Sequence, residues 1–329
     1  MCEEHSTNRI CAKAVSEPGP RNENMAAIKN ARAVASHAGY VALIGRPNAG
    51  KSTLLNRLVG EKIAAVSNKP QTTRFKILGI VNRPEGQIVL VDTPGVHKPG
   101  YALNRRMMAA VHDALLGVDL VCLIRDASVP TGNGDRFVLD LVKQSGKPSL
   151  LLLNKTDRLA DKSKLLPLIE WYQNENDWQA IIPISALKGD QIETLLREMI
   201  SGLPESEPIF AEDELTDQSM RVLAAEIVRE KLLETTGEEI PYVTAVVTEK
   251  WEEVRADFTR IYCAVFVERE SQKKIVIGRG AQRLKQIGMR ARREIEKMLG
   301  HRCHLELFVK VEADWREREH LLDEMGIKP

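Results

Sequence analysis

The stretch GRPNAGKST, which runs from Gly45 to Thr53, fits the spacing G-x-x-x-x-G-K-[ST]. The apolar segment YVALIG ends at its first glycine, and KSTLLNRLVG continues with the apolar spacing of a helix. A strand, a glycine-rich turn and a helix in this order direct backbone N–H groups and the positive end of the helix toward one point. The stretch therefore predicts a phosphate-binding loop at the edge of an α/β sheet.

Apolar segments of strand length alternate with helix-like patterns as far as residue 203. The strand-like segments are FKILGIV, GQIVLVDT, VDLVCLIRD, PSLLLLNK and AIIPISA, and the helical patterns lie near residues 101–117, 133–145, 162–174 and 189–202. The first two strands are joined through NRPEG, a turn signal typical of a hairpin. Residues 40–203 are therefore predicted to form a doubly wound α/β domain whose sheet is mostly parallel, with one antiparallel edge.

The composition changes after residue 203. Residues 204–218 are rich in proline and acidic side chains, which is typical of a linker. Residues 219–329 show a helix, two strands, a basic segment with glycines, a further helical run and a third strand, which indicate a smaller α+β domain. Residues 1–39 contain the coil-forming run SEPGPRNEN and are expected to be a disordered leader.

Composition argues against several classes of protein. The 329 residues carry a net charge of only +1, so no global field attracts nucleic acid or membranes. The five cysteines form no C-x-x-C pair and are widely scattered, which argues against a disulfide scaffold or a zinc site. No apolar run approaches the roughly 20 residues that span a bilayer. Any attraction for nucleic acid must therefore come from a local cluster of charge.

The phosphate-binding loop brings several kinds of ligand with it. Lys51 offers a point charge to the β- and γ-phosphates of a nucleotide, and the Ser52 hydroxyl offers a ligand to Mg²⁺. The later motif VDTPG places Asp92 to hold the Mg²⁺ through a water and the Gly95 N–H to meet a γ-phosphate. The other predicted contacts of the loop are Gly45, Asn48, Ala49, Gly50 and Thr53.

A further motif, NKTD, closes a strand from Asn154 to Asp157. Guanine presents an N1–H and a 2-amino group as donors, and the Asp157 carboxylate only accepts hydrogen bonds. Adenine would leave that carboxylate unpaired, so the motif favours guanine. Lys155 can lie along the base, and Asn154 can tie this loop to the phosphate loop. The predicted base site is completed by Ser185, Ala186 and Leu187 of SALKG, where the Ala186 N–H could meet the guanine O6.

These motifs, in this order, resemble the nucleotide-binding motifs of small GTPases. QTTR (residues 71–74) lies where such domains carry a threonine ligand of Mg²⁺, which is Thr72 or Thr73 here; we select Thr73 as the candidate. With Asn48 before AGKS and a second domain after the first, residues 40–327 resemble the Era-type family of bacterial GTPases.

The resemblance implies a P-loop GTPase domain followed by a KH domain, with GTP or GDP and Mg²⁺ as ligands. It implies hydrolysis of GTP to GDP and phosphate, with Lys51, Thr73 and Asn48 as the residues that act in catalysis. Asn48 is either a turn residue or a ligand of K⁺, whose charge would act where other GTPases use an arginine finger. Val96 stands where Ras-type GTPases carry a water-orienting glutamine, which predicts slow hydrolysis.

The segment between Lys273 and Arg302 gathers ten Lys and Arg residues, opposed only by two glutamates. Such a cluster is a phosphate-binding footprint or a solvated helix face. The resemblance implies a KH domain that binds the 3′ end of small-subunit ribosomal RNA, and KH domains clamp about four nucleotides at a GXXG loop. That loop falls on Gly278 to Ala281, so its last glycine is alanine here, which is unfavourable if the position needs positive φ. The candidate RNA ligands are Lys274, Gly278, Arg279, Gly280, Arg283 and Lys285.

The leading hypothesis is a GTP-hydrolysing switch that binds 16S-type ribosomal RNA and assists assembly of the 30S subunit. One alternative is an RNA-binding assembly factor that uses GTP mainly as a conformational ligand with negligible turnover. Another is a phosphotransferase that acts on a small molecule, against which NKTD counts because it reads a base. The resemblance further implies a cytoplasmic monomer and leaves peripheral contact with the inner membrane open.

Overall fold

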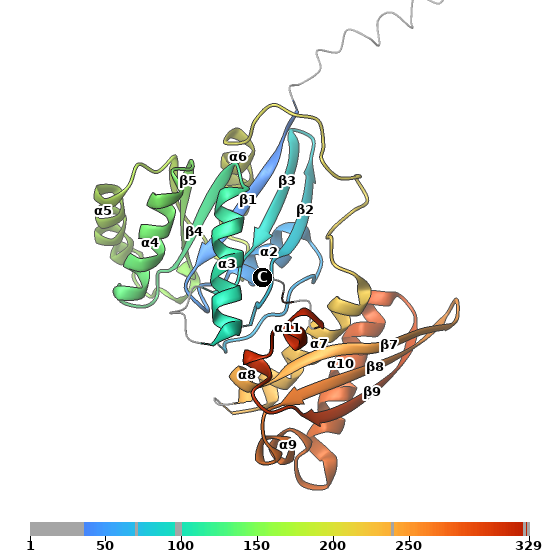
Figure 1. The fold of residues 1–329 in the computed structure, drawn as a ribbon. Coiled ribbons are helices and arrows are strands. Elements are labelled where there is room, and N and C mark those ends of the chain that lie inside the picture. Colours follow the sequence, from blue (N-terminus) through green and yellow to red (C-terminus); the bar gives the residue numbers. More distant parts are fainter. Residues whose placement is uncertain (1–35, 70–71, 96–100, 238–239, 325–326, 328–329) are drawn as a thin grey trace, which may run out of the picture. The chain divides into compact units, whose positions relative to one another are not determined.

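The computed structural model describes residues 36–69, 72–95, 101–237, 240–324 and 327 (Figure 1). Its larger sheet has the strand order β2-β3-β1-β4-β5-β6. The strands are β1 (His37–Gly45), β2 (Ile77–Arg83), β3 (Gly86–Asp92), β4 (Leu120–Asp126), β5 (Ser149–Asn154) and β6 (Ala180–Pro183). Within this sheet β2 runs antiparallel to β3, and the other neighbouring strands pair in parallel. The prediction of a mostly parallel sheet with one antiparallel edge is confirmed.

Apolar side chains of β1 alternate between the two faces of this sheet. Val41 and Leu43 belong to the core on one face, whereas Ala42 and Ile44 belong to the core on the other. The first core is covered by α2 (Lys51–Val59) and α6 (Ile192–Ser201), and the second by α3 (Ala102–Leu116), α4 (Asn133–Ser145) and α5 (Leu165–Glu175). Because both faces are covered, the central strands are continuous apolar runs, as in other doubly wound sheets.

The carboxyl ends of the parallel strands bring the predicted motifs to one edge of the sheet. Strands β1, β3 and β5 end at Gly45, Asp92 and Asn154, and the chain continues from β6 into Ser185. Ligands of open α/β sheets bind outside these ends. The fold therefore places the phosphate motif, the VDTPG motif and both base motifs next to one another.

Residues 204–218, predicted as a linker, run along the edge strand β2. The Ile80 N–H donates to the Leu215 carbonyl at 2.9 Å. The buried Gln87 side chain accepts a hydrogen bond from the Phe210 N–H at 2.9 Å and donates one to the Phe210 carbonyl at 2.9 Å. The segment thus occupies backbone groups of an edge strand that would otherwise be open to another chain.

The second part of the fold is a three-stranded sheet with the order β7-β8-β9. Strand β7 runs antiparallel to β8, and β8 runs parallel to β9. Its elements are α7 (Met220–Thr235), α8 (Ile240–Val243), β7 (Ala245–Arg255), β8 (Phe258–Val267), α9 (Glu270–Ile277), α10 (Gln282–Leu299) and β9 (Arg302–Val311). Ile227 of α7 and Ile295 of α10 share a core with Val265 of β8. The predicted smaller α+β fold is confirmed.

Two helices of this part differ from the sequence-based expectation. Helix α8 precedes β7 and helix α9 follows β8, and neither helix was predicted from the sequence. The side-chain oxygen of Gln272 accepts hydrogen bonds from the N–H groups of Glu268 and Arg269 at 2.9 and 3.0 Å. These bonds satisfy donors at the start of α9, so a local capping contact begins a helix whose apolar pattern is weak.

The C-terminal residues return to the first part of the chain. Trp315 is fully buried, and its Nε1 donates to the Val243 carbonyl at 3.0 Å. It shares a small core with Leu103 of α3 and with Leu322 of α11 (Glu319–Glu324). The helix that follows VDTPG is therefore packed against the end of the chain.

The turn between α9 and α10 has an unusual backbone. Gly278, Gly280 and Ala281 have φ values of 73°, 57° and 59°. The position of Ala281 therefore does need positive φ, which is the case in which alanine is unfavourable. A non-glycine residue held in this region costs about 1 kcal/mol or more.

We predict that Ala281→Gly raises the free energy of unfolding by about 1 kcal/mol, because glycine adopts this backbone without a steric penalty. The matched control is Ala291→Gly, a buried position inside α10, which should lower the free energy of unfolding by about 1 kcal/mol or more. Urea unfolding of both variants checks the opposite signs. A lower free energy of unfolding for Ala281→Gly than for wild type would show that the backbone at Ala281 is not strained.

Candidate nucleotide-binding site

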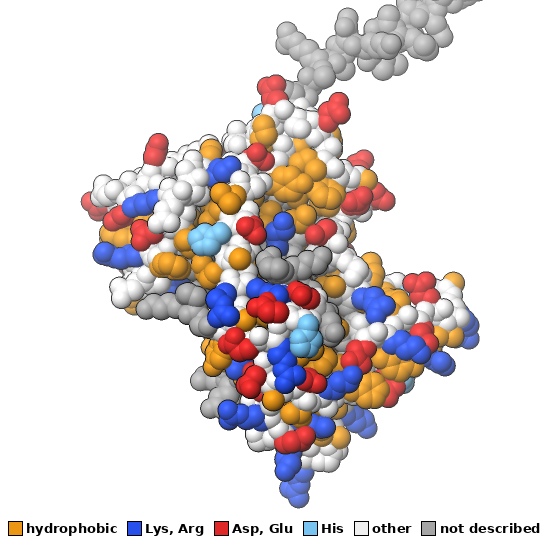
Figure 2. Space-filling model, viewed as in Figure 1, with side chains coloured by type: hydrophobic (Ala, Val, Ile, Leu, Met, Phe, Trp, Pro, Cys, Tyr) orange, Lys and Arg blue, Asp and Glu red, His pale blue; other side chains and the backbone are white. Residues whose placement is uncertain are grey.

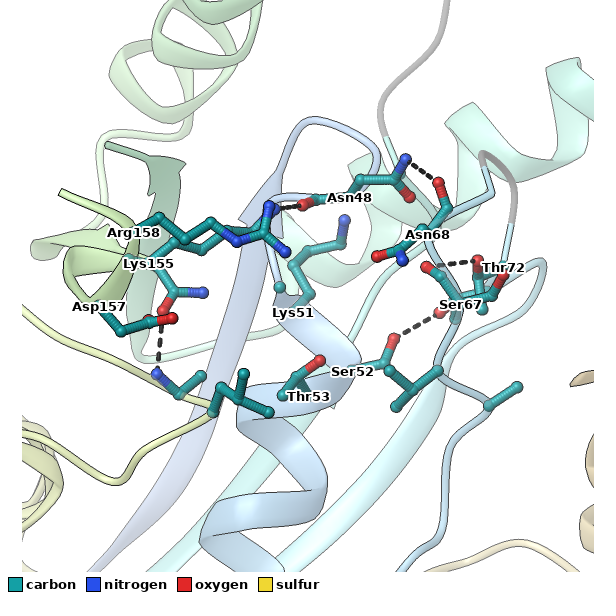
Figure 3. A pocket seen from close by; sticks show the side chains of 18 residues that line it. Asn48, Lys51, Ser52, Thr53, Ser67, Asn68, Thr72, Lys155, Asp157 and Arg158 are labelled. Atoms are coloured by element: carbon teal, nitrogen blue, oxygen red, sulfur yellow. Dashed lines mark hydrogen bonds between the residues drawn. The ribbon is translucent and has the colours of Figure 1, made fainter. Parts of the chain in front are cut away.

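A cavity of about 320 Å³ lies among the motifs at the carboxyl edge of the larger sheet (Figure 3). Of the predicted ligands, its lining contains Asn48, Gly50, Lys51, Ser52, Thr53, Thr73, Gly95, Asn154, Lys155, Asp157, Ala186 and Leu187. The remaining predicted ligands, Gly45, Ala49, Asp92 and Ser185, lie behind this lining and are hydrogen-bonded to it. The structure thus brings the predicted nucleotide ligands together.

The phosphate loop is shaped around the Lys51 ammonium group. Lys51 Nζ donates to the carbonyls of Gly45 and Arg46 at 3.2 and 3.3 Å. Burial lowers the pKa of Lys51, and the negative charge of Asp92 raises it. A largely buried cation that lines a cavity at a helix N-terminus provides a concentrated positive field for phosphate.

Glycine is required at position 50. Gly50 has a φ of 103°, and a Cβ atom there would lie 2.2 Å from Asn154 Nδ2. A side chain would therefore push apart the phosphate loop and the NKTD motif. This close approach explains the second glycine of the phosphate motif in physical terms.

Three oxygen-bearing side chains converge beside the phosphate loop. Ser52 Oγ lies 2.8 Å from Thr73 Oγ1 and 2.8 Å from Asp92 Oδ2, and Thr73 Oγ1 lies 3.3 Å from the same Asp92 oxygen. Burial raises the pKa of Asp92, while Lys51 and the hydroxyl donors lower it. The Asp92 Oδ1 atom is buried and has no hydrogen-bond partner among the described residues. An oxygen-only set with an unsatisfied carboxylate oxygen suits Mg²⁺.

The two threonines of QTTR face different ways. The Thr72 hydroxyl donates to the Lys69 carbonyl at 2.6 Å within its own segment, whereas Thr73 joins Ser52 and Asp92. The geometry therefore favours Thr73 as the metal ligand. Gln71 of the same motif and Val96 after VDTPG lie outside the described residues.

Asn48 connects the phosphate loop to the segment that precedes QTTR. It has a φ of 62°, and its Nδ2 donates to the Asn68 carbonyl at 2.6 Å. Figure 3 shows this contact at the rim of the cavity. The Asn48 amide would therefore have to turn its oxygen toward the Asn68 carbonyl for the two groups to share a cation.

The base motifs are joined by hydrogen bonds. Asp157 Oδ1 accepts a hydrogen bond from the Ser185 hydroxyl at 2.6 Å, which leaves its second oxygen for a ligand. Lys155 Nζ donates to the Asn48 carbonyl at 2.5 Å and forms an ion pair with Asp126 at 2.6 Å. The Lys155 stem is thereby held along one side of the cavity, as expected for a side chain that covers a base.

Several contributors to the site were missed from the sequence, among them Asp126, Asn68 and Arg158. Asp126 ends β4 at the same sheet edge as the other motifs, and that position was a usable signal. Asn68 and Arg158 also line the cavity, and Figure 3 shows the Arg158 side chain beside that of Lys155. Neither residue stands in a recognisable pattern, so only the tertiary structure reveals them.

The basic turn after α9 lies on the second part of the fold. Lys274, Arg279 and Lys285 are exposed. Lys and Arg side chains gather at the lower tip of the view in Figure 2, over this turn. Arg283 is different, because it donates to the Ile275 carbonyl and so closes the turn from within. A Cβ atom at Gly278 would lie 2.7 Å from Arg283 Cβ, which explains that glycine.

A groove of about 360 Å³ continues from this turn between α10 and β9. Its lining is Ala281, Leu284, Lys285, Gly288, Met289, Arg292 and the β9 residues 305–307. Leu284, Met289, Leu305 and Leu307 contribute apolar side chains to the groove. Lys285 and Arg292 contribute positive charge, and Glu306 contributes one negative charge. Apolar surface beside a net positive charge suits the bases and phosphates of an RNA strand.

Comparison with known proteins agrees with both parts of the fold. Residues 40–155 match a family described as "50S ribosome-binding GTPase", and residues 239–316 match the family "KH domain". GTPase Era of Stenotrophomonas maltophilia is 46% identical over 291 residues, which cover 88% of this chain and 97% of the relative. GTPase Era of Trichlorobacter lovleyi is also 46% identical, over 88% of this chain and 97% of the relative.

Two solved structures share the whole arrangement. A variant of Aquifex aeolicus Era bound to GDP and aluminium fluoride is 39% identical, with a TM-score of 0.86 over 89% of this chain and 100% of that chain. A structure of Era in complex with MgGDPNP and nucleotides 1506–1542 of 16S ribosomal RNA has the same identity, coverage and TM-score. The chain therefore belongs to the Era family of GTPases.

Proposed function

We propose that this GTPase acts as a switch that binds 16S-type small-subunit ribosomal RNA and assists assembly of the 30S subunit. One observation supports this proposal above all. The same chain has a nucleotide cavity with a guanine-type base site and a basic groove between α10 and β9. The description of one matched family mentions the 50S subunit, but a full-length relative that is 39% identical holds 16S ribosomal RNA. We therefore assign the small-subunit RNA as the partner.

The proposed nucleotide roles follow the geometry of the cavity. Lys51 would stabilise charge on the β- and γ-phosphates, and Ser52, Thr73 and Asp92 would hold Mg²⁺. Mg²⁺ supplies positive charge to the phosphates when bound. Asp157 would accept hydrogen bonds from the guanine N1–H and 2-amino group, and Lys155 would cover the base. The other proposed contacts are Gly45, Asn48, Ala49, Gly50, Thr53, Gly95, Asn154, Ser185, Ala186 and Leu187.

The proposed RNA contacts are those that the turn leaves accessible. Lys274, Arg279 and Lys285 would contact phosphates, and Gly278 and Gly280 allow the RNA backbone to approach the turn. Arg283 would support the turn from inside, because its guanidinium is bound to a backbone carbonyl. Crosslinking the chain to RNA in cells and sequencing the bound fragments tests this assignment. Fragments from the 3′ end of 16S-type RNA support it, and an unrelated population of RNAs would refute it.

We also propose domain boundaries and a cellular location for the chain. We place the GTPase domain at residues 40–203, the linker at 204–218, the KH-type domain at 219–329 and the leader at 1–39. No described helix is long and apolar enough to cross a membrane. A cytoplasmic monomer, with peripheral contact with the inner membrane, stays a prediction from the family resemblance.

Base preference is the first prediction of this assignment. Asp157→Asn should weaken GTP binding by at least about tenfold, because the amide offers a donor where guanine also has donors. The same variant should gain affinity for XTP, whose C2 carries an oxygen. Titration of wild type and variant with each nucleotide measures the loss of GTP affinity and the gain of XTP affinity. Unchanged GTP affinity would show that Asp157 does not read the base.

Potassium dependence is the second prediction. If Asn48 holds K⁺ beside the Asn68 carbonyl, turnover in KCl should exceed turnover in NaCl of equal ionic strength by about tenfold or more, because a fixed cation stabilises developing charge. Asn48→Gly should abolish the difference, and glycine accepts the φ of 62° at this position. Equal rates of wild type in the two salts would count against the potassium role.

RNA binding is the third prediction. The variant Arg279→Glu/Lys285→Glu should weaken binding of a 16S 3′-end oligonucleotide by at least about tenfold, because it reverses two charges that face phosphates. Changing Gly278 to Asp is a poorer test, since a Cβ there would collide with Arg283. Fluorescence anisotropy measures affinity, and the control is Lys297→Glu, an exposed position of α10 outside the groove lining. If both variants bound the oligonucleotide with the affinity of wild type, the basic segment would be only a solvated helix face.

A further inference from the structure

The Arg57 side chain connects helix α2 to the SALKG loop of the nucleotide site. Arg57 belongs to α2, the helix that begins with Lys51 of the phosphate loop. Its Nε donates to the Ala186 carbonyl at 3.2 Å, and its Nη2 donates to the Leu187 carbonyl at 2.5 Å. A guanidinium carries its donors in a rigid fork, so the two bonds fix two successive carbonyls in one orientation.

These two bonds determine the direction of peptide groups at the base end of the cavity. A peptide group is planar, so fixing the Ala186 carbonyl also fixes the Leu187 N–H. Fixing the Leu187 carbonyl likewise fixes the Lys188 N–H, which donates to Ser185 Oγ at 3.1 Å. The Ala186 N–H donates to Asn154 Oδ1 at 3.0 Å. Within this short loop, Arg57 therefore holds the peptide between Ala186 and Leu187, two residues that line the cavity.

An exposed arginine usually contributes little to a fold. Arg57 differs because both of its described partners are backbone carbonyls of one functional loop rather than a flexible carboxylate. Loss of the guanidinium would transfer the two carbonyls to water and free their peptide planes to rotate. The core of the domain would not change, since neighbouring Leu58 and Leu55 of α2 carry the packing.

We propose that Arg57 is a positioning residue for recognition of the guanine 6-oxygen. It holds the Ala186–Leu187 peptide so that a backbone N–H of this loop meets that oxygen, while Asp157 meets the opposite edge of the base. The inference rests on the proposed guanine site. Its chemical signature follows from the base: the 6-oxygen is common to guanine and hypoxanthine, whereas the 2-amino group belongs to guanine alone.

The test compares GDP with IDP on Arg57→Ala and Arg57→Lys in the full chain. For Arg57→Ala, both dissociation constants should rise by the same factor of about ten, through faster dissociation, because a charge-assisted hydrogen-bond pair is lost on the side shared by both bases. Arg57→Lys keeps one donor and should show an intermediate loss. The matched control is Arg83→Ala, which removes an exposed arginine that pairs with the Glu193 carboxylate at 3.0 Å and not with a backbone carbonyl of the SALKG loop.

Several outcomes would overturn the proposal. These are unchanged affinity of Arg57→Ala, an equal loss in Arg83→Ala, or a loss for GDP without a loss for IDP. Thermal unfolding of each variant separates a local effect from general destabilisation, and the graded response of Arg57→Lys provides a result that unfolding would not produce. Failure of wild type to prefer GDP over ADP would instead refute the guanine site itself, so the two failures are distinguishable.

Discussion

The buried amide of Asn154 fixes the nucleotide site. Its Nδ2 donates to the Ala49 carbonyl at 2.8 Å, and its Oδ1 accepts a hydrogen bond from the Ala186 N–H at 3.0 Å. One side chain thereby fixes the positions of the phosphate loop, the NKTD loop and the SALKG loop relative to one another. The approach is close enough that position 50 must be glycine. A buried amide that lost either partner would carry an unsatisfied polar group at a cost of about 1–3 kcal/mol.

The segment between α2 and β2 connects the nucleotide site to the second part of the chain. Val66 and Thr72 line the nucleotide cavity. The Val66 N–H donates to Glu230 of α7 at 2.7 Å, and the Arg229 guanidinium donates to the Thr72 carbonyl. Lys62 pairs with the same buried Glu230 at 2.5 Å. The segment thus touches the nucleotide cavity on one side and α7 on the other, so any effect of nucleotide on these contacts acts reciprocally on nucleotide affinity.

The sequence predicted those parts of the structure that depend on local pattern. Strand, loop and helix around GRPNAGKST predicted the phosphate site, and the position of NKTD at a strand end predicted its place in the cavity. The contributions of Arg57, Arg158 and Asn68 could not be predicted, because these residues stand in no periodic pattern and reach the site only through the tertiary structure. Helix α9 was missed since its start depends on a capping side chain. The course of residues 204–218 along β2 was missed because backbone pairing there carries no apolar signal.

The alanine in the GXXG loop shows how sequence and structure complement each other. The sequence identified the departure at Ala281 and the condition under which it matters. The backbone, with a φ of 59°, meets that condition. The turn therefore carries strain where the groove begins, next to exposed Arg279 and Lys285. Affinity for RNA at this site would depend on charge more than on a close fit of the backbone.

The proposed function requires that one chain join a hydrolysing GTP site to an RNA-binding groove. It is tested by single-turnover hydrolysis of GTP by the full chain, with and without an RNA that carries the 3′ end of 16S-type ribosomal RNA. Release of phosphate by the chain alone should be slow but measurable, and its rate should change when the RNA is bound. Release that never exceeds the protein-free rate, in either condition, would contradict the claim and would favour an assembly factor that uses GTP only as a conformational ligand.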